Sequence, residues 1–595
     1  MCEANKMIKP NPEQESIINY FTQNNTNKRI LLVEAPPGTG KTFTAVATAM
    51  NYVRFNIRNN PRYSKKVLIL TFSKNARAQI EKQLDILSSD DINWGKYIEI
   101  TNFHSFFQKY VWAYSKYLGL KENLIIMSPK QRREILQGKF STIPGYDINN
   151  KDQYDWAETL LEGDFTPLTR YGNVKASVKK LIPYKEDIKN IIKEVNKEGY
   201  IGFSDIAYYM MELLNKSQTL LSVIQNKYNL IILDEYQDSS DLQDKIVKKL
   251  IGKKNKAIFF ADSKQMIYEW RGASSERLNN LLNDYKGEIE QKELIEVMRF
   301  KNRNDIENIL KDAREGKHNI SDYTSSENIK YVQVKVEDKN MFIPQIRNHM
   351  YAVLKYKILN ELPKYEERKI KSIGILCRGN ELVSYIKKAF REEFKIYSQT
   401  ICNNEDEHNI ICDLIEFMRK QHAKIEKDEL CREVFKYIFA VIYDNNIGSI
   451  KRKNLDIMSF ESLEKAHLDI LKTIRHCIEK AYEDNDYYKC LYNIVKLVSN
   501  ANFKINRDMM FIVRRVLSLS SYSEDKVMDI FLQYQYLKAF KELKGIYVLN
   551  VHQSKGREFD YVYLIDREAI NKEENLLYVA LSRVKEKLVV FDWVV

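Results

Sequence analysis

The sequence predicts an α/β fold built from two parallel sheets, each interrupted by a mainly helical insertion. Short apolar runs that are typical of buried strands form two groups, one between residues 31 and 260 and one between residues 331 and 591. Inside each group lies a long stretch with a helical pattern, at about 106–200 in the first and about 383–541 in the second. A chain of 595 residues is too long for a single core, and its length favours about four domains.

Composition indicates a soluble globular protein, with 29% charged and 44% hydrophobic residues. No apolar run approaches the ~18 residues that a membrane span requires. The first residues contain no apolar signal core, so we expect a cytoplasmic protein without a membrane partner.

The net charge of +13 favours a polyanionic partner. Heavy use of Lys, Asn, Ile and Tyr, as in proteins from AT-rich genomes, would by itself also raise the lysine count. The seven cysteines form no C-x-x-C pair, which argues against a zinc ribbon or iron–sulfur cluster and favours free thiols.

The first expected strand, 31–34, leads into a glycine-bearing loop and then a helix over about 42–52. This segment matches G-x-x-x-x-G-K-[ST] except that Ala35 replaces the first glycine. The backbone N–H groups of such a loop surround phosphates, the lysine reaches the β- and γ-phosphates, and the threonine binds Mg²⁺. The candidate nucleotide-binding residues are Ala35, Pro36, Pro37, Gly38, Thr39, Gly40, Lys41 and Thr42. The alternative is a Gly-Lys-Thr turn in an ordinary loop.

Two further residues near this segment are candidates for ligand contacts. Gln14 precedes the loop, and its amide can donate and accept at once, as reading adenine requires; a surface loop is the alternative. Phe72 follows the second expected strand, 67–70, at the sheet edge where ligands bind, and its ring could stack on a base. A third strand is expected at 97–100.

The expected strand 229–233 delivers Asp234 and Glu235 at its carboxyl end. In a nucleotidase with a phosphate-binding loop, the first acid would hold Mg²⁺ and the second would orient or deprotonate the attacking water. The alternative is a strand that simply ends in solvated acids. The phosphate-binding loop found earlier in the chain makes this alternative the less favoured one.

Another strand, 257–260, is followed by Tyr268 and Trp270 beside a basic residue. Aromatic rings interleaved with positive charge suit stacking on single-stranded bases, although a tryptophan packed in the core is the alternative. The second sheet is expected from runs at 331–334, 373–376, 547–550, 561–564 and 588–591.

Taken together, these segments resemble the UvrD/Rep/PcrA group of superfamily 1 DNA helicases. The most specific matches are the string from Val551 to Phe559, of the form H-x-S-K-G-x-E-F, and the string from Tyr578 to Arg583, of the form Y-V-A-x-[TS]-R. The resemblance implies two RecA-like P-loop motor domains, 1A and 2A, each with a helical insert, 1B and 2B. The implied boundaries are 1–105 and 201–288 for 1A, 106–200 for 1B, 289–382 and 542–595 for 2A, and 383–541 for 2B.

The resemblance also implies roles for individual residues. It makes Gln265 a sensor of the γ-phosphate, Arg299 and Arg583 the arginines that motor 2A points at that phosphate, and Glu558 a contact on the ribose side. It assigns base stacking to Phe72, Tyr268 and Trp270, and it assigns coupling and contact with the DNA strand to His552 and Lys555.

Two residues depart from the family pattern. Met298 stands where the family usually has a tyrosine that stacks on adenine, and Phe43 stands where the family often has an arginine. We therefore expect Phe43 to supply the missing aromatic face of the adenine site.

The implied activity is ATP- and Mg²⁺-dependent movement in the 3′→5′ direction on single-stranded DNA, with separation of 3′-tailed duplex DNA. A second interpretation is a DNA-dependent ATPase subunit that serves a partner nuclease or effector, for example in antiphage (antiviral) defence, and unwinds weakly by itself.

Overall fold

In the computed structural model of the chain, the described residues are 9–23, 28–88, 92–127, 129–163, 176–268, 273–299, 303–317, 326–335, 344–390, 414, 417, 425–442, 444–484, 486–503, 505, 509–510, 513–514, 517, 545–573 and 575–594. They form two compact units, of which one contains both large sheets and the other spans 125–132 and 402–538.

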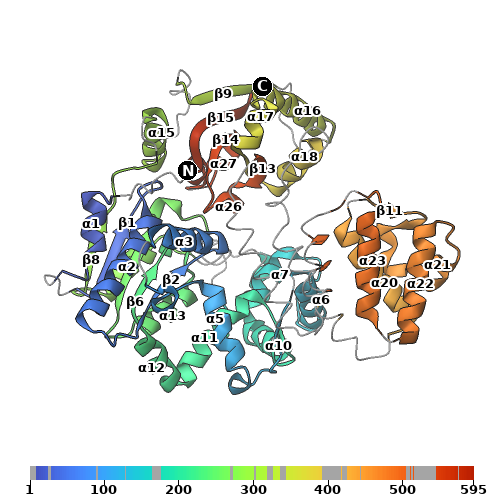
Figure 1. Cartoon of the computed structure of the whole chain (residues 1–595), viewed down its shortest axis with the longest axis horizontal. Coiled ribbons are helices and arrows are strands. Elements are labelled where there is room, and N and C mark those ends of the chain that lie inside the picture. Colours follow the sequence, from blue (N-terminus) through green and yellow to red (C-terminus); the bar gives the residue numbers. More distant parts are fainter. Residues whose placement is uncertain are drawn as a thin grey trace. The chain divides into compact units, whose positions relative to one another are not determined.

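The first large sheet has six parallel strands in the order β3-β2-β6-β7-β1-β8 (Figure 1). The strands are β1 (Ile30–Glu34), β2 (Lys66–Thr71), β3 (Ile98–Asn102), β6 (Tyr228–Leu233), β7 (Lys256–Ala261) and β8 (Ile289–Glu293). Five of them match the expected apolar runs, because a parallel strand covered on both faces is apolar at nearly every position.

The sixth strand, β8, was not expected from the sequence. Its polar sequence, Ile-Glu-Gln-Lys-Glu, gives no strand signal, because it lies at the sheet edge and is only partly covered. It pairs with β1 from Ile289 to Glu293. The first sheet therefore includes residues beyond 288, and the domain boundaries that the resemblance implies stay a prediction.

Helices accompany the strands of this sheet. They include α1 (Pro12–Ile18), α2 (Lys41–Asn59), α3 (Lys74–Leu87), α5 (Phe103–Ala113), α11 (Phe203–Lys216), α12 (Gln218–Lys227), α13 (Asp241–Ile251) and α14 (Arg277–Asp284). Side chains of α1 and α2 pack with the apolar residues of β1, β2, β6 and β7 in one core cluster. This packing fixes the carboxyl edge of the sheet, where the loops leave.

The stretch between α5 and α11 is mainly helical, as expected. Its described elements include α6 (Pro129–Phe140), α7 (Lys151–Glu158), α9 (Ala176–Lys179) and α10 (Lys185–Lys197), and two strands of two residues each, β4 (Ile125–Ile126) and β5 (Tyr200–Ile201).

The second large sheet has five parallel strands in the order β13-β10-β14-β15-β9. The strands are β9 (Ile329–Lys335), β10 (Ser372–Cys377), β13 (Gly545–Asn550), β14 (Phe559–Ile565) and β15 (Val584–Val594). They include every run expected in the second half of the chain. The accompanying helices are α15 (Asn304–Arg314), α16 (Pro344–Glu361), α17 (Tyr365–Ile370), α18 (Asn380–Phe390), α26 (Val551–Ser554), α27 (Arg567–Asn571) and α28 (Leu576–Leu581).

The second compact unit has a core of its own. Its described helices include α20 (Lys427–Val441), α21 (Phe460–Glu464), α22 (Asp469–Asp484) and α23 (Tyr487–Asn500), and β11 (Asn446–Ile447) pairs with β12 (Ile450–Lys451). The apolar faces of the four helices meet in one cluster of buried residues. The division of the whole chain into four domains stays a prediction.

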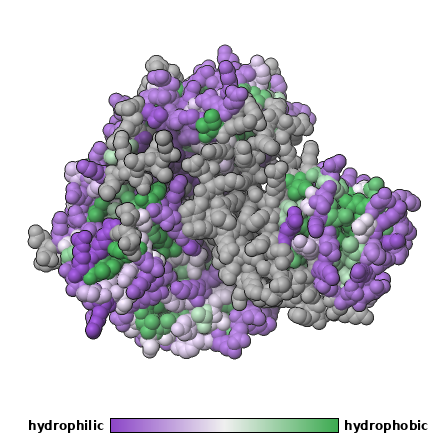
Figure 2. Space-filling model, viewed as in Figure 1, coloured by the Kyte–Doolittle hydropathy of each residue, from purple (hydrophilic) through white to green (hydrophobic). Residues whose placement is uncertain are grey.

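The face shown in Figure 2 is mostly hydrophilic over the described residues, with smaller hydrophobic areas between them. Among the helices that the structure describes, none is both long and apolar enough to cross a membrane.

A substitution at Gly374 in β10 tests the packing of the second sheet. A Cβ atom added there would lie 2.5 Å from the ring of Phe559, which is fully buried. We expect Gly374→Ala to lower the free energy of unfolding by about 1–3 kcal/mol, the usual cost of overpacking a core. Denaturant titration measures the change. Gly379→Ala is the control, because no described atom lies within 4 Å of the carbon it adds. An unchanged stability of Gly374→Ala would contradict this packing.

Candidate functional site

The loop between β1 and α2 has the conformation that a phosphate-binding loop requires. Gly38 and Gly40 have φ values of +82° and +86°, in the left-handed region that favours glycine. Helix α2 begins at Lys41, and its N-cap, Gly40, provides no side-chain hydrogen bond. The first N–H groups of a 19-residue helix therefore form a positive end that suits an anion.

Side chains from outside the loop pack closely against it. The amide Nε2 of Gln14 donates to the Thr39 carbonyl at 3.0 Å, and its Oε1 accepts from the Asn11 N–H at 3.1 Å. A Cβ atom at Gly40 would lie 2.5 Å from that Nε2. The structure thus places Gln14 beside the loop with both amide atoms engaged, and its reading of adenine stays a prediction.

Lys41 lies among carboxylates at the carboxyl edge of the sheet. Its Nζ is 3.2 Å from Oε1 of Glu235, and its side chain is 10% exposed. Burial acts to lower the pKa of Lys41, but Glu235, Asp262 and Asp234 outweigh it and raise the pKa. The ammonium group is therefore charged and ready to bind phosphate oxygens.

The two acids at the end of β6 differ in their electrostatics. Burial and the neighbouring Glu235 carboxylate raise the pKa of Asp234. Burial also acts to raise the pKa of Glu235, but Lys41 and Lys555 reverse the effect and lower it. Glu235 has φ +55°, a conformation that costs a non-glycine residue free energy and that clusters at functional sites. Its ionised carboxylate can accept a proton from water.

The donor set suits Mg²⁺ and a nucleotide. Thr42 on α2 and Asp234 after β6 offer a hydroxyl and a carboxylate oxygen, and the loop offers backbone N–H groups. Among the described residues, no group of three or more His, Cys, Asp or Glu could hold a metal ion. Mg²⁺ needs no such cage, because it retains waters and binds one or two protein oxygens together with substrate phosphates.

Arg583 reaches this edge from the second sheet, and its side chain is buried. Its Nη2 donates to Oε1 of Gln265 at 3.0 Å, and its Nε donates to the Val579 carbonyl at 3.0 Å. Burial, and then Arg299, lower the pKa of Arg583. The predicted sensor and the predicted arginine are therefore direct partners.

Arg299 lies against the loop itself. A Cβ atom at Gly38 would lie 2.8 Å from the Cβ of Arg299, and the adjacent Met298 N–H donates to the Gly38 carbonyl at 2.8 Å. The Arg299 guanidinium forms an ion pair with Glu558 and donates to the Ser582 carbonyl at 2.8 Å. Arg299 therefore contacts both the loop at Gly38 and Glu558, and its charge contributes to the lowered pKa of Arg583.

Three of the predicted base-stacking or strand-contact residues form an aromatic cluster. The rings of Phe72 and Tyr268 stack with centroids 5.1 Å apart and an interplanar angle of 25°. The ring of His552 lies 6.0 Å from that of Tyr268, whose hydroxyl donates to the His552 carbonyl at 3.2 Å. Trp270, the fourth aromatic residue of the prediction, lies outside the described residues.

Lys555, whose contact with the DNA strand stays a prediction, is paired inside the protein in this structure. Its Nζ lies 2.6 Å from Oδ2 of Asp238, and the two side chains are 7% and 1% exposed. It also donates to the Gln265 carbonyl. A buried carboxylate needs a cation nearby. In this structure the ammonium group of Lys555 pairs with Asp238 and is shielded from solvent.

Sequence reasoning missed a second group of charged and polar contacts at the same edge. Arg314 at the end of α15 donates to Asp262 and to Glu34, each at 2.9 Å, and Tyr578 also donates to Asp262. In the sequence, Arg314 is one more basic residue at a helix end, and such residues are usually solvated. Only the three-dimensional contacts distinguish it.

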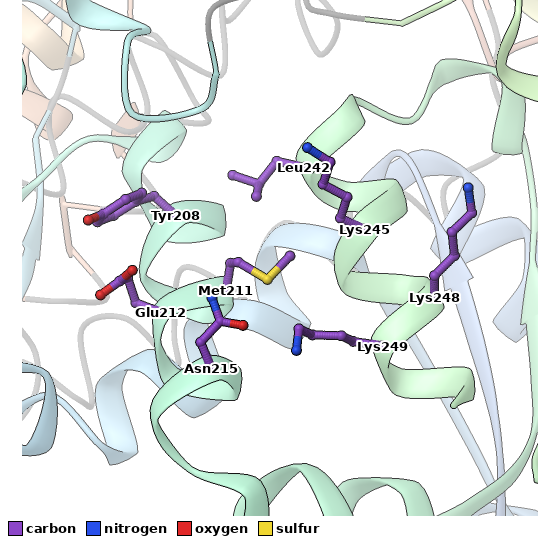
Figure 3. Close-up of a pocket in the computed structure, with 8 residues that line it drawn as sticks. All are labelled: Tyr208, Met211, Glu212, Asn215, Leu242, Lys245, Lys248 and Lys249. Carbon is purple, nitrogen blue, oxygen red and sulfur yellow. The ribbon is translucent and has the colours of Figure 1, made fainter. Parts of the chain in front are cut away.

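A surface groove between α11 and α13 is separate from this site. Met211 of α11 faces Leu242 and Lys245 of α13 across it, and none of the predicted site residues lines it (Figure 3).

Comparisons with known proteins agree with the geometry. The UvrD/REP helicase N-terminal domain model matches residues 11–286, and the UvrD-like helicase C-terminal domain model matches residues 545–591. A probable DNA helicase II homolog from Mycoplasma capricolum subsp. capricolum is 23% identical, over 95% of this chain and 82% of the relative. The ATP-dependent DNA helicase PcrA from Staphylococcus aureus is 20% identical, over 95% of this chain and 81% of the relative. A probable DNA helicase II homolog from Mycoplasma pneumoniae is 23% identical, over 94% and 81%.

The position of Phe43 in the first turn of α2, half-buried, keeps it available as an adenine platform. We expect Phe43→Ala to raise the KM for ATP about tenfold, equivalent to ~1.4 kcal/mol, because a stacking face is lost. Met298→Ala should change KM much less, because Met298 contacts the loop through its backbone N–H. ATP titrations at saturating single-stranded DNA measure both. Equal KM values for wild type and Phe43→Ala would show that the ring packs within the protein instead.

Proposed function

The chain belongs to the UvrD-like helicases, and from that premise we propose that it is an ATP-dependent DNA helicase that moves 3′→5′ along single-stranded DNA. The observation that carries the proposal is the contact between Arg583 of the second sheet and Gln265 of the first, beside Lys41 and Glu235. It supports a nucleotide site completed by residues from both sheets, as a motor driven by ATP requires.

The residues around the loop suit hydrolysis. Bound ATP with Mg²⁺ would supply the phosphoanhydride bond and the charge that the site recognises. The loop N–H groups and Lys41 would bind the phosphates, and a phosphate would replace Glu235 as the partner of the lysine. Glu235 would then orient the water and accept its proton, and Arg299 and Arg583 would stabilise developing negative charge.

The contacts of Gln265 offer a route from the nucleotide to the strand. Its amide binds Arg583, its carbonyl binds Lys555, and Tyr268 follows three residues later. A shift of Arg583 toward a phosphate would pull on this segment. We infer that the Phe72–Tyr268 stack opens to admit a base when the segment moves, and that repeated opening advances the strand.

Glu235→Gln tests the catalytic part of the proposal. The amide retains the shape of the side chain but cannot accept a proton, so we expect turnover to become undetectable while ATP and single-stranded DNA still bind. Phosphate release and fluorescent-nucleotide binding measure the two properties. The matched control is Glu293→Gln on the exposed edge strand β8, which should hydrolyse normally. Near-normal hydrolysis by Glu235→Gln would remove this residue from catalysis.

Duplexes with single-stranded tails of opposite polarity test direction. Purified protein with ATP and Mg²⁺ should separate a 3′-tailed duplex and leave a 5′-tailed one intact, as measured by strand displacement with fluorescent strands. Preference for the 5′ tail would refute the polarity. Single-strand-stimulated ATP hydrolysis without separation of either duplex would instead favour the ATPase subunit that acts with a partner nuclease.

A further inference from the structure

Asp262 is a buried acid on which several elements converge. It follows β7, and its side chain is fully buried. Its Oδ1 accepts from the Lys264 N–H at 3.2 Å and from Arg314 at 2.9 Å, and its Oδ2 accepts from Gln265 at 2.9 Å and Tyr578 at 3.2 Å. The two oxygens have four donors, and Arg314 is the cation among them.

Arg314 binds two acids at once. Its Nη1 reaches Asp262 and its Nη2 reaches Oε1 of Glu34, each at 2.9 Å. Because β1 and β7 are paired with Glu34 opposite Ala261, the two acids leave the sheet side by side. The planar fork of a guanidinium can bind both, whereas an ammonium group presents a single charged centre.

Two of the donors, Arg314 and Tyr578, belong to a different sheet from the acids that they bind. Arg314 ends α15, whose Ile306, Ile309 and Ala313 pack in a core cluster with β14, β15 and α28. Tyr578 lies on α28 in the same cluster. Arg314 and Tyr578 are therefore anchored to the second sheet, whereas Glu34 ends β1 and Asp262 follows β7 of the first.

The two acids are also adjacent to the nucleotide site. Glu34 precedes Ala35, the first residue of the loop, and the Ala35 N–H donates to the Ala261 carbonyl at 2.9 Å. Asp262 holds the amide nitrogen of Gln265, and this leaves the amide oxygen to face Arg583 at 3.0 Å. A change at Arg314 is thereby transmitted to the contact that carries the proposed function.

We propose that Arg314 is a positioning residue, which binds Glu34 and Asp262 so that the second sheet holds the nucleotide loop and Gln265 in the geometry for hydrolysis. This assignment rests on the proposed function, because it concerns the turnover of the same site. Arg314 acts through Asp262 and Glu34 and itself has no role in the chemical step.

Kinetics of Arg314 variants test the proposal. Arg314→Ala should lower kcat for ATP about tenfold or more, equivalent to a barrier increase of at least ~1.4 kcal/mol, while KM changes less than about threefold. Arg314→Lys should recover part of kcat, because it restores the charge near Asp262 but not the fork. The control is Lys311→Ala on the same helix, whose exposed side chain pairs with Glu307 and should leave kcat unchanged.

A double-mutant cycle separates positioning from general stability. If Arg314 acts through Asp262 and Gln265, Arg314→Ala and Gln265→Ala together should cost much less in kcat than the product of their separate effects. Fully multiplicative effects, or an Arg314→Ala variant with wild-type kcat, would overturn the proposal. If Arg314→Ala does not fold, Tyr578→Phe, which removes the hydrogen bonds of the Tyr578 hydroxyl with Asp262 and with Arg314, takes its place in the cycle.

Hydrogen exchange without nucleotide distinguishes this failure from failure of the proposed function. Arg314→Ala should speed backbone exchange at residues 30–41 and 261–266, and Lys311→Ala should not. This measurement tests the contact between the sheets even if the wild type hydrolyses no ATP. Absence of hydrolysis by the wild type would refute the proposed function alone. Unchanged exchange in Arg314→Ala would refute the positioning role.

Discussion

The parallel pairing of β1 with β7 is the constraint on which the site depends. It sets Glu34 opposite Ala261, and the hydrogen bond from the Ala35 N–H to the Ala261 carbonyl continues the pairing into the loop. Strand β6 lies on the other side of β7 and ends at Leu233, so that Asp234 and Glu235 emerge at the same edge. Three polar segments that are far apart in the sequence therefore meet at one edge of the sheet, as expected where parallel strands end together.

This convergence creates an electrostatic problem, because it buries acids close to one another. Three of these acids are each paired with a cation: Glu235 with Lys41, Asp238 with Lys555, and Asp262 with Arg314. Leaving a buried charge without its partner costs several kcal/mol. Two of the three cations come from elements of the second sheet, so the second sheet completes the charge balance of the first. The nucleotide loop and the interface between the sheets are thus parts of one electrostatic arrangement.

The sequence predicts much of this fold because buried parallel strands are apolar throughout, and runs such as 31–34 and 373–376 stand out. Strand β8 could not be found in this way, since an edge strand pairs through its backbone and needs no apolar pattern. The proximity of Lys41 to Asp234 and Glu235 could be expected from their motifs, because both motifs follow strands that end at the same edge of the sheet. Arg314 could not be predicted in this way, because its partners Glu34 and Asp262 are distant in sequence and nothing local marks the helix end. Lys555 was predicted as a strand contact, which stays a prediction, and its burial against Asp238 could not be read from the sequence because it depends on the fold.

Gln265 connects the nucleotide site to the segment that carries Tyr268 of the aromatic cluster. Its amide nitrogen binds Asp262, its amide oxygen binds Arg583, and its carbonyl accepts from Lys555. A residue held at three points cannot move alone, so a displacement of Arg583 must either break a bond or carry the segment with it. Tyr268 is only three residues along the chain and is stacked on Phe72, which follows β2 of the first sheet. In the proposed mechanism, a displacement of Arg583 would therefore reach the aromatic cluster through Gln265 and the residues bonded to it.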